Sequence, residues 1–90
     1  MIIGLFINKK KQNSTNHLQI DLQKVEKLGL SKREYQVLKE VALGLSNQEI
    51  AQKLFVTEST IKTHVSNILV KLNAKRRTQA IQISKNLNII

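Results

Sequence analysis

The clearest pattern of apolar and polar positions lies between Thr57 and Leu72. Apolar residues recur there at intervals that place them on one stripe of a helix with about 3.6 residues per turn. These residues are Ile61, Val65, Ile68, Leu69 and Leu72. Thr57 is a preferred helix-capping residue, and Glu58 suits the positive end of a helix. The pattern therefore predicts an amphipathic helix over residues 58–72 whose apolar stripe faces a core.

The other side of this helix carries side chains that are cationic or form hydrogen bonds. They are Lys62, Thr63, Ser66, Asn67 and Lys71, without a single acid among them. A face of this kind suits contact with DNA. The alternative is that it is simply the solvated face of a surface helix.

A second helix is predicted immediately before the first. Ser46 and Glu49 have the spacing of a capping box, in which each residue bonds to the backbone amide of the other. Ile50, Ala51 and Leu54 would face inward, and the helix would end near Phe55. Two helices joined by so short a turn must cross sharply, which predicts a helix-turn-helix with its second helix free to enter a major groove.

Two further helices complete the predicted domain. A capping box formed by Ser31 and Glu34 predicts a helix that runs to about Leu43 and ends at Gly44. Its buried residues would be Val37, Leu38, Val41 and Ala42. A last helix is predicted from Thr78 to about Asn88, with apolar residues at Ala80, Ile81, Ile83 and Leu87. These occupy more of the circumference than a single core-facing stripe needs, so part of this helix is a candidate association surface.

Residues 1–29 form the predicted extension, and residues 30–90 form the predicted domain. Within the extension, spacing favours a short helix from His17 to Leu28 ended by Gly29, although residues 18–22 also alternate as a strand would. The apolar residues 1–7 precede a run of three Lys and are too few to span a bilayer. They are interpreted as the cytoplasmic end of a membrane anchor in a longer parent protein, a short packed element, or an expression boundary.

Composition narrows the function classes. Ninety residues allow one small domain, which weighs against an enzyme with an enclosed catalytic cleft. The formal net charge of +9 favours a polyanionic partner, either nucleic acid or an anionic membrane surface. No Asp or Glu follows Glu58. The chain has no Cys, which is compatible with a reducing cytoplasm, and it carries no metal or cofactor motif.

The two His residues provide the remaining candidate chemistry. A basic nuclease using His17 and His64 as acid and base is the enzyme alternative, but no carboxylate cluster is available to hold a metal. His64 lies on the flank of the predicted buried stripe. We therefore expect a packed, hydrogen-bonded imidazole there, and no catalytic residue.

Residues 30–81 resemble the C-terminal DNA-binding domain of LuxR-type (NarL/FixJ/GerE-like) bacterial transcriptional regulators. The resemblance lies in four segments of this sequence: LSKRE at 30–34, GLSNQEIA at 44–51, STIKTH at 59–64, and KL at 71–72 followed by a late Arg. It implies an all-α, four-helix helix-turn-helix domain that binds promoter DNA, regulates transcription, and dimerises through its last helix. It also implies RNA polymerase as a further candidate partner.

The resemblance implies roles for individual residues as well. Base contacts are implied for Lys62, Thr63 and Ser66. Contacts with the DNA backbone are implied for Asn47, Thr57, Ser59, Thr60, Lys71, Arg76 and Arg77. Ile83 and Leu87 are the candidate dimer contacts. Ser66 departs from the family, because relatives often carry Lys there, so base preference does not transfer.

Members of this family usually carry a sensory domain upstream. The first 29 residues are too few for one. We therefore expect this chain to be the effector part of a larger regulator, and a stand-alone effector is the alternative. The alternative function is a membrane-surface or protein-interaction module that uses the apolar start and the Lys run. A membrane becomes a partner only if the parent protein is anchored upstream of Met1.

Overall fold

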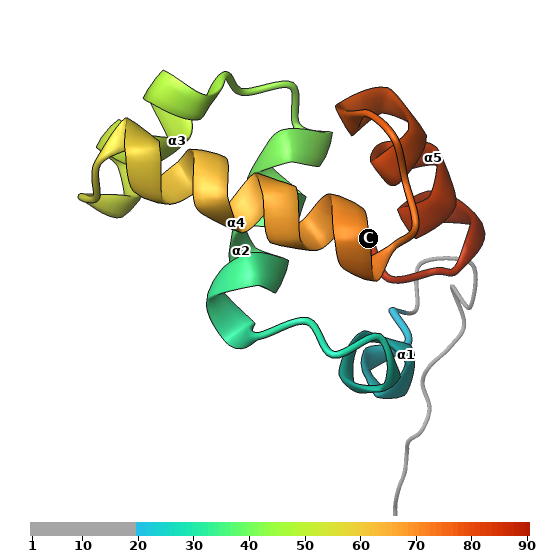
Figure 1. Cartoon of the computed structure of the whole chain (residues 1–90). Helices are drawn as coiled ribbons and strands as arrows, with labels where there is room; N and C mark the ends of the chain where they lie inside the picture. The colour runs from blue at the N-terminus through green and yellow to red at the C-terminus, as the bar shows by residue number, and fades with distance from the viewer. Residues whose placement is uncertain (1–19) are drawn as a thin grey trace, which may run out of the picture.

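The computed structural model describes residues 20–90, which fold into five helices (Figure 1). In chain order these are α1 Leu22–Lys27, α2 Lys32–Ala42, α3 Asn47–Leu54, α4 Glu58–Lys71 and α5 Arg77–Asn86. Residues 20–90 contain no strand, so the predicted all-α class is confirmed. Helices α2 to α5 are the four predicted for the domain, and α1 lies within the short helix predicted from His17 to Leu28.

The helix starts follow from the capping residues read in the sequence. Ser31 and Ser46 each accept a hydrogen bond from the amide three residues on, and the carboxylate of the Glu at that position accepts one from the Ser amide. Thr57 accepts from the Thr60 amide at 3.1 Å. The predicted beginnings of α2, α3 and α4 are therefore confirmed.

The helix predicted over residues 17–28 begins later than predicted, because residues 20 and 21 are not helical. Asp21 accepts hydrogen bonds from the amides of Gln23 and Lys24, so it caps a helix that begins only at Leu22. Residues 20 and 21 are in neither helix nor strand and Leu22 is helical, so the strand alternative does not hold for residues 20–22. The last helix begins at Arg77, one residue before the predicted start at Thr78. It ends at Asn86, two residues before the predicted end at Asn88.

All five described helices end in the same way. Each helix is followed by a residue with a positive φ, which is the C-cap itself in α3 and the residue after the C-cap in the other four. The backbone amide of the residue after this position donates to the carbonyl five residues back. The positive-φ residues are Gly29, Gly44, Phe55, Asn73 and Asn88. The residues that follow them are all apolar and all lie in or against the core: Leu30, Leu45, Val56, Ala74 and Ile89. This repeated turn directs the chain back into the core after every helix.

The core lies where α4 packs against both α2 and α3. Its most deeply buried side chains include Val37 and Leu38 from α2, Ile50 from α3 and Ile61 from α4. Val65 and Leu69 are partly buried and pack against this cluster, so the predicted stripe of α4 is confirmed. Ile89 is also fully buried, which the sequence pattern did not indicate.

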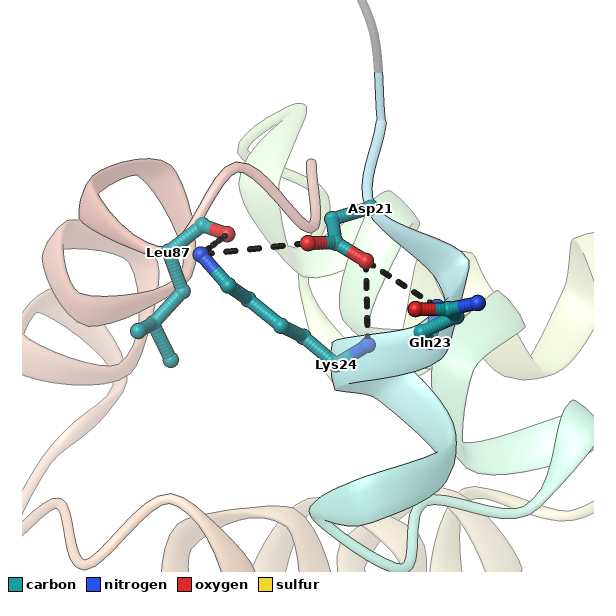
Figure 2. A network of polar contacts seen from close by, with 4 residues as sticks. All are labelled: Asp21, Gln23, Lys24 and Leu87. Atoms are coloured by element: carbon teal, nitrogen blue, oxygen red, sulfur yellow. Dashed lines mark hydrogen bonds and ion pairs between the residues drawn. The ribbon is translucent and has the colours of Figure 1, made fainter.

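Helix α1 is tied to the C-terminal end of α5 (Figure 2). The Asp21 amide donates to the Asn88 carbonyl at 2.8 Å, and Lys24 Nζ donates to the Leu87 carbonyl at 3.3 Å. Val25 is buried in the same core as the other helices. The boundary at residue 30 stays a prediction, but α1 shares the core of the helices that follow it.

Several predictions concern residues 1–19 and lie outside the described residues. They are the apolar stretch at 1–7, the Lys run, and His17. Among the helices of residues 20–90, none combines the length and apolar character needed to cross a membrane.

Candidate nucleic-acid interface

The three candidate base-contacting residues lie exposed on one face of α4. Lys62, Thr63 and Ser66 point away from the side that buries Ile61 and Ile68. Thr63 Oγ1 donates to the Ser59 carbonyl at 3.2 Å, which leaves the lone pairs of its hydroxyl to accept from a ligand. Within residues 20–90, Lys62 takes part in none of the ion pairs. This face therefore presents one cation and two hydroxyls to solvent.

The first turn of α4 presents the next candidates. Thr57 and Ser59 are exposed and Thr60 is half-buried. The two threonine hydroxyls lie 2.9 Å apart, and Thr57 Oγ1 also accepts from the Thr60 amide. Helix N-terminal amides carry partial positive charge and favour anions, although Glu58 lies in the same turn.

Asn47 and Arg77 are bonded to each other. Arg77 Nη1 donates to Asn47 Oδ1 at 2.6 Å, and Arg77 Nη2 donates to the Leu45 carbonyl at 2.7 Å. The guanidinium thereby joins the start of α5 to the start of α3. Any contact of these two side chains with phosphate would have to share or break these bonds.

Lys71 is paired as well. Its Nζ lies 2.6 Å from Oε1 of Glu34, whose side chain is only 7% exposed. Burial raises the pKa of Glu34, but the hydrogen bond from Lys71 and that from the Ser31 amide outweigh it, so the pKa falls below its ordinary value. Glu34 therefore caps α2 and pairs with the end of α4, a link that the capping-box motif did not reveal.

Among the cations of the candidate backbone contacts, Arg76 alone has neither an ion pair nor a side-chain hydrogen bond within residues 20–90. It is exposed, caps α5 without a side-chain hydrogen bond, and takes part in no ion pair of residues 20–90. Its guanidinium can meet a phosphate without losing a protein contact. Arg76 thus differs from its neighbour Arg77, whose guanidinium is bonded to Asn47 and to the Leu45 carbonyl.

His64 is half-buried, as predicted, but the expected hydrogen bond is absent at one nitrogen. Its Nδ1 is buried and has no hydrogen-bond partner within residues 20–90. No group of three His, Asp or Glu side chains in this part of the chain is placed to hold a metal ion.

The candidate dimer contacts lie on α5 and beside its end. Ile83 and Leu87 are both half-buried and pack against the core. Their outer surfaces remain available, while Ala80 and Ser84 are the fully buried positions of α5. Ser84 Oγ donates to the Ala80 carbonyl at 2.7 Å, which explains how a polar side chain is buried there.

Comparison of the sequence with known proteins shows which protein family it resembles. The family model described as bacterial regulatory proteins, luxR family, matches residues 28–84. The chain is 61% identical over 51 residues to the transcriptional regulatory protein YxjL of Bacillus subtilis, covering 57% of this chain and 23% of YxjL. It is 49% identical over 61 residues to the response regulator protein VraR of Staphylococcus aureus, covering 68% of this chain and 29% of VraR.

The fold is also similar to a solved structure. The response regulator ChrA of a heme-sensing two-component system matches with a TM-score of 0.65 and 36% identity, over 74% of this chain and 36% of that one. The chain thus spans about a quarter to a third of the length of these relatives.

Proposed function

Because the chain belongs to the luxR family of bacterial regulatory proteins, we propose that it binds double-stranded promoter DNA in a sequence-specific manner and regulates transcription. The observation that carries the proposal is the exposed polar face of α4. This face contains no acid, whereas the opposite stripe of the same helix is buried against α2 and α3. The family match favours this function over a membrane-surface module.

In the proposed complex, α4 lies in the major groove. Lys62, Thr63 and Ser66 meet base edges, where a Lys ammonium donates to the acceptors of guanine and a hydroxyl donates or accepts. Their exposure supports this assignment, and so does the finding that Lys62 takes part in no ion pair of residues 20–90. Ser66 discriminates among bases less sharply than Lys would at the same position.

The backbone contacts fall into two groups by the bonds that their side chains already make. Four residues are proposed as direct phosphate contacts, through hydroxyls, helix amides and a guanidinium that has no ion-pair partner within residues 20–90: Thr57, Ser59, Thr60 and Arg76. Asn47, Lys71 and Arg77 are held by internal partners. For these three, we propose that contact with phosphate adds to bonds that position the helices.

We also propose that the chain acts as the effector part of a larger regulator. The matched stretches cover only 23% of YxjL and 29% of VraR, and VraR is named a response regulator. In such a protein, a signal received elsewhere would control DNA binding here, in the cytoplasm. RNA polymerase is then a further proposed partner.

Dimerisation through α5 is proposed from the outer surfaces of Ile83 and Leu87. Sedimentation velocity on DNA of two half-sites would test it. Leu87→Asp should give a complex with one protomer where the wild type gives two, while its melting temperature shows that it is still folded. Two bound protomers in this folded variant would remove Leu87 from the interface.

The experiment that tests DNA binding itself is a titration of the domain with fluorescent duplexes in moderate salt. Saturable binding to duplex DNA that weakens as salt rises is expected. Equal binding to single-stranded and double-stranded DNA would contradict recognition through a major groove.

A further inference from the structure

An open apolar groove lies between α2 and the C-terminal end of the chain. Five of its lining residues are apolar or aromatic: Ile20, Tyr35, Ala42, Leu43 and Ile90. Its volume is about 420 Å³, within the range of about 300–1,000 Å³ that binding sites occupy. We call it the α2–α5 groove.

The hydroxyl of Tyr35, one of the lining residues, is already hydrogen-bonded. The Tyr35 hydroxyl donates to the Ile89 carbonyl at 2.6 Å, so its ring serves as a wall. Leu43 is 69% exposed, although it is apolar. Burying such surface against a partner is favourable.

The two charged residues of the groove are both lysines. Lys39 Nζ lies over the Tyr35 ring, 5.1 Å from its centroid, and Lys85 stands on the α5 side. Neither ammonium takes part in an ion pair of residues 20–90, and Glu40, the neighbour of Lys39, is paired with Lys53. The groove therefore combines an apolar floor with two cations that have no ion-pair partner within residues 20–90.

The groove is also separate from the proposed DNA contacts. Its lining residues come from α2, α5 and the segments beside α1, α2 and α5, and none belongs to α3 or α4. Lys39 and Lys85 are accordingly not among the residues proposed to contact phosphate. A partner bound there would leave the face of α4 uncovered.

We propose that the α2–α5 groove binds a short amphipathic segment of a partner protein, with apolar side chains facing the groove and carboxylates flanking them. The apolar floor accepts the side chains, as in helix-in-groove recognition. The carboxylates pair with Lys39 and Lys85, and these charges select an acidic segment over a basic one. The partner and DNA bind at the same time.

The test uses the whole 90-residue chain and two synthetic peptides. Each is a helix of about 15 residues, long enough to be marginally stable alone, with Leu on one face. One carries Glu beside the Leu residues and the other carries Lys. Amide chemical shifts of the isotope-labelled protein are followed as each peptide is added, with and without duplex DNA.

The Glu peptide is expected to shift amides around Tyr35, Leu43 and Lys85, with DNA bound or absent, and the Lys peptide is expected to bind at least about tenfold more weakly. The double variant Lys39→Glu, Lys85→Glu should lose about tenfold in affinity for the Glu peptide. Leu43→Ser should weaken binding too, and the exposure of Leu43 means that the fold tolerates it.

The matched control is Lys27→Glu, Lys32→Glu, which makes the same charge change at exposed residues outside the groove. An equal loss in this control would reduce the effect to net charge and overturn the proposal. So would equal binding of both peptides, or shifts confined to α4. Shifts at the groove that depend on protein concentration alone would assign it to a second copy of the chain. Binding to anionic phosphatidylglycerol vesicles without binding to the Glu peptide would assign it to a lipid surface.

Discussion

Arg77 Nη1 donates to Asn47 Oδ1 over 2.6 Å, across 30 positions of sequence. The same guanidinium donates to the Leu45 carbonyl, so one side chain fixes the start of α5 to the start of α3. Since α3 is packed against α4, this link also fixes the position of α4, the helix proposed to enter the major groove of DNA. Arg77 is thus a positioning residue in addition to any contact with phosphate.

Arg77→Met should lower the free energy of unfolding by about 1.5–3 kcal/mol, because it leaves two partly buried acceptors without a charged donor. Urea denaturation measures the loss. The exposed neighbour gives the control, and Arg76→Met should change stability by no more than about 0.5 kcal/mol. A double-mutant cycle with Asn47→Ala should show a coupling of at least about 0.5 kcal/mol. Strict additivity would mean that the bond contributes nothing.

The pair of Glu34 and Lys71 makes stability depend on pH. The folded state lowers the pKa of Glu34, so its contribution is present above the unfolded pKa, near 4.5, and is lost as pH falls through the folded value. Glu34→Gln should cost about 1.5–3 kcal/mol at pH 7. The difference from wild type should shrink below about pH 4.5.

Glu40→Gln is the matched control for this pair. It removes an ion pair with Lys53, whose side chain is 52% exposed, so it should cost at most about 1 kcal/mol. Glu49 also has a lowered pKa, through its bonds with Ser46, which is why each variant is compared with wild type at every pH. A penalty for Glu34→Gln that stays constant down to pH 3 would rule out the ion pair as its source.

Phe55 is the one large residue at the five helix-ending turns. Its φ is 59°, in the left-handed region that Gly adopts without strain, and its side chain is 93% exposed. Phe55→Gly should therefore raise the free energy of unfolding by about 0.5–1 kcal/mol. Phe55→Ala keeps the Cβ and should not. A destabilised Gly variant, measured by thermal melting, would show that the exposed ring has a stabilising contact.

Arg76→Ala should weaken DNA binding on every sequence to a similar extent. Because one phosphate contact is lost, the slope of log K against log salt should decrease by about one. Lys27→Ala, on α1, should leave the slope unchanged. Fluorescence anisotropy across a salt series measures both. A slope that Arg76→Ala does not alter would place this residue off the DNA.

How far the sequence predicted this structure depends on the range of each interaction. The caps at Ser31, Ser46 and Thr57 and the stripe of α4 depend on residues within four positions of each other, so they could be read directly. The bonds of Arg77 with Asn47 and of Lys71 with Glu34 join residues 30 and 37 positions apart, and no local pattern encodes them. Ile89 lies beyond the last helix, and its burial follows from the turn at Asn88.

The site divides in the same way. Exposure of Lys62, Thr63 and Ser66 followed from helical periodicity, because the opposite stripe had to be buried. The family resemblance supplied the candidate backbone contacts, but it could not distinguish Arg76, which has no ion-pair partner within residues 20–90, from the internally bonded Arg77. That distinction needed the hydrogen bonds that Arg77 donates to Asn47 and to the Leu45 carbonyl.

The central claim is that the face of α4 reads base sequence. The most direct test selects binders from a randomised duplex library at salt high enough to suppress non-specific binding, using the wild type and Lys62→Ala. The wild type should enrich one motif with two half-sites. Lys62→Ala should lose about 1–3 kcal/mol of discrimination at one base position of each half-site. No enrichment by the wild type, or an identical motif from Lys62→Ala, would contradict the claim.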